Sequence, residues 1–229
     1  MKKFFVVGLG NFGFNISRTL VENDCEVLGI DSSREVVQHA KDFISHAVIG
    51  DASDRSVLES LSINDFDAAV VSLGQDMASS ILIALHLKEM KVPRIVVRAV
   101  SEEHGKVLKM IGVDDVVYPE KDMAVRVASR LALRNAIDYL PISDEYAIVE
   151  VEPPKSFIDK SLKELMIASR FSCQVIGLKN PGRNGDHDDL SGKNLDFKIA
   201  PSADDVIRRG TVMVILGKVH DIERLRKTS

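Results

Sequence analysis

The sequence predicts an α/β protein: a doubly wound parallel sheet followed by a small α+β domain. Short runs rich in Val and Ile recur along the first 135 residues, and segments with helical spacing of apolar residues separate them. Runs that do not alternate with polar residues are typical of strands covered by helices on both faces. The rhythm changes after residue 135. We therefore expect domains at 1–135 and 136–229, with the boundary near 135–144.

Six strands and their connecting helices are expected in the first domain. The strands are Phe4–Val7, Val27–Ile30, Ala47–Ile49, Ala68–Ser72, Ile95–Ala99 and Val116–Tyr118. Apolar residues at helical spacing mark the buried faces of three of these helices. The faces are Phe12, Ile16 and Leu20; Val57, Leu58 and Leu61; and Met77, Ile81, Ala84 and Leu85. The stretch Ser32-Ser-Arg-Glu35 predicts a capping box that opens the second helix.

The second part of the chain begins after a predicted helix at Asp122–Leu133. Met123, Val127 and Leu131 share one face of this helix, and Ala124 and Ala128 lie beside it. Beyond it we expect strands at Tyr146–Glu152, Gln174–Leu178, Phe197–Ile199 and Val212–Leu216, a short helix opened by Ser161-Leu-Lys-Glu164, a polar loop at 180–189 and a last helix from His220. A module of this size holds only a marginal core, so docking or dimerisation would stabilise it.

The stretch GLGNFG, between the first strand and the first helix, predicts a phosphate-binding loop. Gly8 permits the tight turn, Gly10 leaves room for phosphate, and Gly13 lets the helix and strand pack closely. The helix N-terminus offers N–H groups and a partial positive charge to an anion. Asp31 ends the second strand roughly 20 residues after the glycines, where the dinucleotide-binding fingerprint has an acidic residue. Its carboxylate would accept hydrogen bonds from ribose hydroxyls and repel the 2′-phosphate of NADP.

Loops at the carboxyl ends of the other strands should line the same crevice. Asp51 either accepts from the adenine amino group or helps to cap the helix that starts near Asp54. Arg98, at the end of an apolar strand, either pairs with a phosphate or carboxylate or marks a simple surface strand end. The expected binding residues are Gly8, Gly10, Asn11, Phe12, Gly13, Asp31, Ser32, Asp51, Ala52, Gly74 and Arg98.

Composition excludes several classes of function. The net charge is −4, and positive and negative residues alternate along the chain without forming a basic stripe. This pattern argues against nucleic acid as a partner. The apolar runs are shorter than the roughly 20 residues that cross a bilayer. The N-terminal MKKFFVV is interrupted too early for a signal peptide, so we expect a cytoplasmic protein. Cys25 and Cys173 are far apart without CxxC or a nearby His, which predicts buried thiols rather than a disulfide or zinc site.

The second domain decides between catalysis and sensing. A dehydrogenase needs a substrate domain with an acid–base residue near the nicotinamide, and the sequence contains no His–Asp or Tyr-x-x-x-Lys constellation of that kind. Ligand sensing is therefore favoured over hydride transfer, and no catalytic residue is expected. An NAD-dependent oxidoreductase with a degenerate second domain is the alternative.

Several stretches together resemble one family, the RCK/KTN regulatory subunits of Trk- and Ktr-type potassium transporters. The stretches are VVGLGNFG, the acid of GIDSS, GDAS, SLGQD, VVRA, GVDDVVYPEKDMA, SLKEL and QVIGL, which span nearly the whole chain. The resemblance implies a Rossmann-like (TrkA-N) nucleotide-binding domain, a crossover helix that matches Met123–Leu133, and a TrkA-C-like module.

The resemblance also implies an assembly and a function. Members pair, exchange the crossover helix and stack into an octameric ring that docks on the cytoplasmic face of a separate potassium-conducting membrane subunit. ATP and ADP, or NADH and NAD, favour different ring shapes, and the ring gates the pore. The family glutamate that approaches the neighbouring subunit's phosphates and helps to hold a divalent or monovalent cation matches Glu120. Some relatives bind cyclic di-AMP at the C-terminal module.

One position departs from the family pattern. Many ATP-sensing members have Arg between the second glycine and the aromatic residue, and this chain has Asn11. An amide donates hydrogen bonds but carries no charge. ATP, ADP, AMP and NAD(H) all stay open as ligands, as does a free-standing sensor that serves another transporter.

Overall fold

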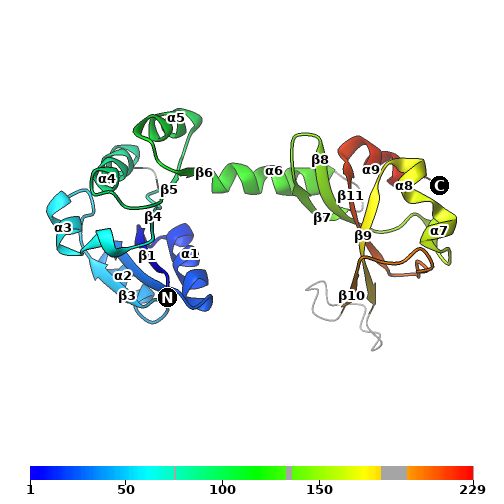
Figure 1. Cartoon of the computed structure of the whole chain (residues 1–229), viewed down its shortest axis with the longest axis horizontal. Coiled ribbons are helices and arrows are strands. Elements are labelled where there is room, and N and C mark those ends of the chain that lie inside the picture. The colour runs from blue at the N-terminus through cyan, green and yellow to red at the C-terminus, as the bar shows by residue number, and fades with distance from the viewer. Residues whose placement is uncertain (75, 133–135, 182–194, 229) are drawn as a thin grey trace. The chain divides into compact units, whose positions relative to one another are not determined.

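The computed structural model describes residues 1–74, 76–132, 136–181 and 195–228. Within these ranges the chain forms two compact units, Met1–Pro119 and Glu120–Ser229 (Figure 1). The predicted division at 135/136 assigns the crossover helix to the nucleotide-binding domain. That assignment concerns the assembled protein and stays a prediction.

The first unit is a six-stranded sheet in the order β3-β2-β1-β4-β5-β6, and all of its pairs are parallel. Its strands are β1 Lys3–Val7, β2 Glu26–Asp31, β3 His46–Ile49, β4 Ala68–Val71, β5 Ile95–Arg98 and β6 Asp115–Val117. The predicted doubly wound sheet is confirmed. The strand order reverses direction at β1 and β4, which is the switch point where such folds bind ligands.

Five α-helices and one 3₁₀ turn connect these strands. They are α1 Asn11–Glu22, α2 Arg34–Ala40, α3 Arg55–Ser60, η1 Ile63–Asp65, α4 Met77–Glu89 and α5 Glu102–Ile111. Ser33, not Ser32, caps α2: its side chain accepts from Val36 N. The predicted capping box is therefore wrong, because Glu35 is the second residue of the helix and not the third.

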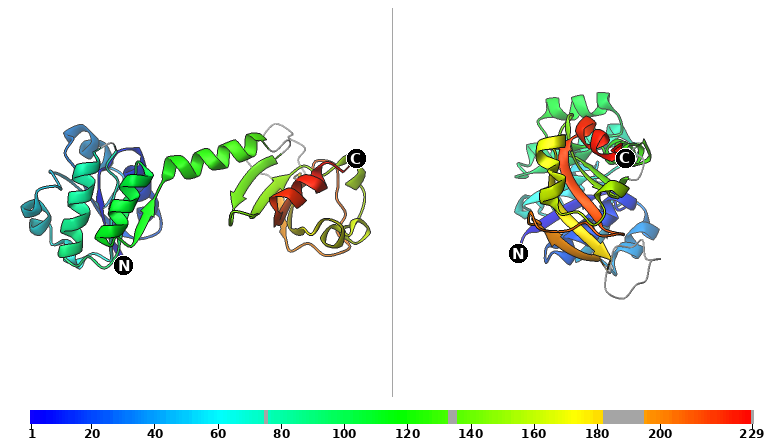
Figure 2. Two further views of the ribbon diagram at one scale, coloured as in Figure 1. Left: turned by 90° about the horizontal axis from the view of Figure 1, so that it is seen from above. Right: turned by 90° about the vertical axis from the view of Figure 1, so that its right-hand side faces the viewer.

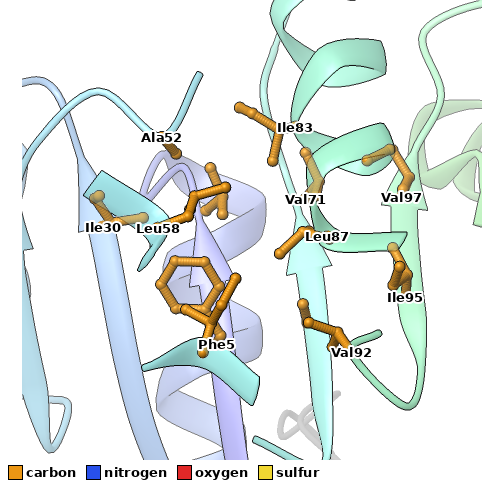
Figure 3. Packing of buried hydrophobic residues seen from close by; sticks show 14 of the residues in the cluster. Phe5, Ile30, Ala52, Leu58, Val71, Ile83, Leu87, Val92, Ile95 and Val97 are labelled. Atoms are coloured by element: carbon orange, nitrogen blue, oxygen red, sulfur yellow. The ribbon is translucent and has the colours of Figure 1, made fainter. Parts of the chain in front are cut away.

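The core of the first unit lies on both faces of the sheet. Figure 3 shows one face, where Phe5, Leu58 and Leu87 pack as fully buried side chains. The predicted face of α4 is only half right: Ala84 is buried and Ile81 packs against the core, but Met77 and Leu85 are 44% and 40% exposed. Its buried residues are Ser80, Ile83, Ala84 and Leu87. The apolar residues of α4 are distributed around the whole helix, so their spacing could not identify the buried face.

The second unit is a five-stranded antiparallel sheet in the order β10-β9-β11-β8-β7. Its strands are β7 Ala136–Pro141, β8 Tyr146–Val151, β9 Gln174–Pro181, β10 Leu195–Ile199 and β11 Val212–Lys218. The predicted α+β domain is confirmed. The sequence did not predict β7, an edge strand in which only Tyr139 is buried among the described side chains.

Short helices cover this second sheet. They are η2 Lys155–Phe157, α7 Leu162–Leu165, α8 Ile167–Phe171 and α9 Val219–Arg226. The predicted opening of α7 is confirmed: Ser161 accepts from Glu164 N, and the Glu164 carboxylate accepts from Ser161 N. Phe157, Leu165 and Ile222 join the buried side chains of β8 and β11 in a separate core. The predicted loop at 180–189 lies largely outside the described residues.

Helix α6, Pro119–Ala132, is a single unbroken helix (Figure 2). None of its residues is buried, and Met123, Val127 and Leu131 are 55%, 39% and 77% exposed. The Arg126 guanidinium donates two hydrogen bonds to the Asp138 carboxylate of β7, at 3.1 and 2.5 Å. This ion pair links α6 to β7 within the second unit. Among the described residues, no helix has the length and apolar character that crossing a membrane requires.

Candidate functional site

The loop between β1 and α1 is built on two glycines that no other residue can replace without strain. Gly8 has φ +84°, and its N–H donates to Ile30 O at 2.8 Å. A Cβ atom on Gly13 would lie 1.9 Å from the carbonyl oxygen of Gly8. The loop and the first turn of α1 therefore touch backbone to backbone, as the glycine spacing predicts.

The N-terminus of α1 is uncapped. Its N-cap residue is Gly10, no side chain bonds there, and the first turn contains no acidic residue. A Cβ on Gly10 would meet no atom within 4 Å among the described residues, so space is open beside it. Free N–H groups, the positive end of the helix dipole and open space together suit a phosphate.

Asp31 joins this loop to the next helix. Its Oδ2 accepts from Leu9 N at 2.8 Å, directly after Gly8, and its Oδ1 accepts from Ser33 N at 2.8 Å. Both oxygens of the Asp31 carboxylate thus already accept hydrogen bonds from backbone N–H groups. Each carboxylate oxygen retains further acceptor capacity, so a ribose hydroxyl can still bind there.

A crevice of about 330 Å³ opens at the carboxyl ends of the strands, within the usual size range of ligand pockets. Six predicted site residues line it: Gly8, Asp31, Ser32, Asp51, Ala52 and Gly74. The other lining residues are Val7, Ile30, Gly50, Leu73, Asp76, Ser79 and Ile83. The predicted site did not include Ser79 and Ile83 because they belong to α4, whose buried face the sequence could not identify.

Asp51 lies in the crevice and does not cap the next helix. Its Oδ1 accepts from Ser53 N at 2.9 Å and from Ser53 Oγ at 2.7 Å. The residue that caps α3 is Asp54, which accepts from Ser56 N at 2.9 Å. The geometry therefore leaves Asp51, an exposed residue, as a candidate acceptor for the ligand.

The remaining predicted residues gather at the start of α1, outside the crevice lining. Asn11 is the first, exposed residue of the helix, and Phe12 is half-buried. The Arg98 guanidinium carbon, at the end of β5, lies 5.9 Å from the centre of the Phe12 ring. This distance is consistent with a cation–π contact, and it places a positive charge beside the first turn of α1.

Glu120 is the first residue of the second unit. It is an exposed residue of the first turn of α6. In the described parts of the chain, no three His, Cys, Asp or Glu residues are arranged to hold a metal ion. A cation at Glu120 that needs a neighbouring subunit stays a prediction.

The fold and the crevice define the class: a doubly wound α/β domain with a ligand-sized crevice, followed in the chain by a small antiparallel domain. The chain belongs to the TrkA family of potassium-uptake proteins, because the TrkA-N domain matches residues 4–119 and the TrkA-C domain matches residues 146–228. The predicted resemblance is confirmed.

Among the relatives, Ktr system potassium uptake protein C of Bacillus subtilis is 36% identical over 99% of this chain and 96% of its own length. Protein A of the same organism is 35% identical over 97% of this chain and 95% of its own length. Among solved structures, the GsuK RCK domain covers 100% of this chain at 17% identity with a TM-score of 0.66. The GsuK channel bound to NAD gives a TM-score of 0.64 at the same identity. This chain spans less than half the length of these GsuK chains, at 48% and 40%.

Proposed function

We propose that this chain is a nucleotide-binding regulatory subunit that gates a Trk/Ktr-type potassium uptake system and has no catalytic activity of its own. One observation carries the proposal: the uncapped N-terminus of α1 stands beside Asp31 at the switch point of the sheet. A phosphate cradle thus lies in a chain similar over nearly its full length to Ktr potassium uptake proteins.

Different residues of the crevice and of α1 would bind different parts of the nucleotide. The α1 N-terminus and Gly10 would receive phosphate, Asp31 would accept from ribose hydroxyls, and Asp51 would accept from the adenine amino group. In its described part, the crevice lining offers no His, Lys, Cys or Tyr side chain as an acid–base partner for a substrate. This lining favours sensing over the alternative of an NAD-dependent oxidoreductase.

Regulation then follows from differential binding. A nucleotide shifts a conformational equilibrium only by the difference in its affinity for the two states. A coupling of about 1–3 kcal/mol is enough for 5–150-fold changes. Closing or opening the crevice would change the distances between ligand and Asp31, so a change of shape and a change of affinity are linked.

The assembly belongs to the same proposal. The exposed apolar side chains of Met123, Val127 and Leu131 on α6 suit burial against a second copy of the chain. We infer an oligomeric ring that acts at the cytoplasmic face of the membrane subunit, with Glu120 near a cation between subunits. Cyclic di-AMP at the C-terminal domain is a second ligand to test.

The proposal is tested by binding, by mass and by transport. Calorimetric titration of ATP, ADP, AMP, NAD, NADH and cyclic di-AMP, with native mass measurement, should show an oligomer that binds an adenine nucleotide. Potassium uptake through the Trk/Ktr-type membrane subunit of the same genome should depend on this chain and fall with Gly10→Ala. A monomer that binds none of these ligands, or robust NADH production from hydroxy acids, contradicts the proposal.

A further inference from the structure

His104 is a buried histidine in the first turn of α5, and the proposed function gives it no role. Its side chain is 3% exposed. Its Nδ1 accepts a hydrogen bond from Val100 N at 3.3 Å, and its own backbone N–H donates to Ser101 Oγ at 3.1 Å. Ser101 is the N-cap residue of α5. The His104 residue therefore holds the turn between β5 and α5 with both its ring and its backbone.

The hydrogen bond from Val100 fixes the protonation state of the His104 ring. A ring nitrogen that accepts a hydrogen bond carries no proton, so the neutral ring has its proton on Nε2. Nε2 is buried and has no hydrogen-bond partner among the described residues. A second proton would have to enter at Nδ1, where it would turn the acceptor into a donor that faces the Val100 N–H. Protonation of the ring and its bond to Val100 thus exclude each other.

The surroundings of the ring oppose a positive charge. Burial lowers the pKa of His104, because the charged form loses its contact with water. The first turn of α5 is the positive end of the helix dipole, which repels a cation. The charged residues nearest to the ring along α5, Glu102, Glu103 and Lys106, are all exposed. The folded protein therefore keeps this ring neutral below the ordinary pKa of histidine, about 6.5.

Helix α4 packs against α5 and brings no titratable side chain into their contact, as far as the described residues show. The side chains that α4 buries are Ser80, Ile83, Ala84 and Leu87. Its charged residues lie elsewhere. Lys88 lies beside Gly112, at the opposite end of α5. His86 and Glu89 lie beside charged residues at the start of α3.

The strands next to α5 likewise place their charged groups away from the ring. Asp115, the first residue of β6, pairs with Arg94 at the amino ends of the parallel strands, whereas α5 begins beyond the carboxyl end of β5. Tyr118 Oη lies directly over Gly105, where a Cβ atom would clash with it, and a phenol is neutral below about pH 10. Arg98 of β5 faces α1, on the other side of the sheet. The charge of this ring therefore depends on its own burial and on its bond to Val100.

We propose that His104 is an acid-sensitive lock on the turn between β5 and α5: the neutral ring holds the turn closed, and a proton on Nδ1 releases it. The inference goes beyond the proposed function and does not depend on a bound nucleotide. The turn follows directly on the strand end that carries Arg98 over the Phe12 ring of α1. Acidification would therefore loosen α5 and change the position of a positive charge beside α1.

Proton linkage gives the sign and the size of the effect. In the open turn the ring is exposed and binds a proton with the ordinary pKa of about 6.5, whereas in the closed turn its pKa is lower. The closed turn is therefore fully stable above about pH 6.5 and loses stability as the pH falls below that value. Between pH 7.5 and 5.5 the equilibrium constant for opening α5 should rise at least threefold, and a single proton limits the rise to about tenfold.

The test is amide hydrogen exchange of the full chain at pH 7.5 and 5.5, with each rate corrected for the intrinsic exchange rate at that pH. Peptides from Glu102–Ile111 should show the rise in the opening constant, because α5 is released locally. Peptides from Lys3–Val7, in the same unit, should change by less than about twofold. The absence of a rise in α5, or an equal rise in both segments, overturns the inference.

Two matched variants separate the proton from the rest of the structure. His104→Asn offers Val100 N an amide oxygen as acceptor and binds no proton in this pH range, so its opening constant for α5 should stay within about twofold between pH 7.5 and 5.5. The control is His46→Asn, which makes the same change at an exposed histidine of β3. It should keep the rise of the original protein. The same rise in His104→Asn contradicts the role of His104.

A direct titration of the original protein keeps the inference testable even if His104→Asn fails to fold. Exchange of the imidazole Cε1 hydrogen for deuterium, followed over a range of pH by peptide mass spectrometry, reports the protonation of each histidine. We expect the pKa of His104 in the folded chain to lie below the ordinary value of about 6.5. A value at or above it would mean that the ring accepts a proton without release of the turn, and the lock would be refuted.

Discussion

Two glycines of the phosphate loop should fail in different ways when each is replaced by alanine. A Cβ on Gly13 would lie 1.9 Å from the Gly8 carbonyl oxygen, whereas ordinary contacts begin near 3.4 Å. The start of α1 would therefore have to move from β1 by more than 1 Å, roughly the difference between these distances. A Cβ on Gly10 would meet no described atom within 4 Å, and its φ of −62° suits alanine.

The magnitudes follow from these contacts. Overpacking of this kind costs about 1–3 kcal/mol, so Gly13→Ala should destabilise the first unit even without ligand. For a unit of this size, about 4 °C of melting temperature corresponds to each kcal/mol, which gives a fall of roughly 4–12 °C. Gly10→Ala should stay within about 0.5 kcal/mol of the original protein. It should nevertheless lose at least about tenfold in nucleotide affinity, because the new methyl group fills the space for phosphate.

The assay pairs thermal unfolding without ligand with calorimetric titration of the same samples. Gly13→Ala should lower both stability and affinity, and Gly10→Ala only affinity. Wild-type melting of Gly13→Ala would refute the close contact between loop and helix. Wild-type affinity of Gly10→Ala would refute the placement of phosphate at α1.

Three further predictions follow from single contacts. Asp31→Ala should weaken nucleotide binding strongly in calorimetry and cost about 1 kcal/mol in thermal unfolding, since two backbone amides lose their acceptor; unchanged affinity would mean that ribose is not held there. Arg126 lowers the pKa of the Asp138 carboxyl, so this group stabilises the fold at neutral pH and the stabilisation is lost as pH falls through the lowered pKa. The free energy of unfolding of Asp138→Asn should therefore depend less on pH between about 7 and 3 than that of the original protein. The same pH dependence in both proteins would contradict this. Burial raises the pKa of the Cys173 thiol to about 11, so iodoacetamide at pH 8 should label the partly exposed Cys25 in native protein and label Cys173 only after unfolding, as peptide mass spectrometry would show.

The sequence predicted the parts of the fold whose signals are local. Val- and Ile-rich runs identified all six parallel strands. For the four inner strands the reason is that strands buried on both faces need continuous apolar sequence, whereas the edge strands β3 and β6 are only partly buried. Gly8, Gly13 and Asp31 were predictable as neighbours, since glycine spacing and the acid at the strand end follow from backbone geometry. The capping pair Ser161 and Glu164 was likewise set within four residues.

The features that the sequence missed depend on tertiary contacts. The residues of α5 gave no predicted apolar face, because the centre of this helix contains the buried pair His104 and Gly105. The cap at Ser101 and the left-handed Gly112 were the available signals. Strand β7 contains the charged Asp138, which is stabilised by Arg126 from another element. No local pattern indicates such a partner.

The separate cores of the two units lead to a last prediction, on where nucleotide binding is felt. The bonds of Asp31 connect the ligand crevice to β1 and α2, both in the first unit, while the core of the second unit is separate. A ligand at 100 times its dissociation constant adds about 2.7 kcal/mol to the state that binds it. In hydrogen exchange, peptides from Lys3–Val7 should therefore gain protection with NADH, and peptides from Tyr146–Val151 should not. If instead both strands gain equally, the two units share the binding energy as one cooperative body. Nucleotide binding would then stabilise the second unit as well as the first.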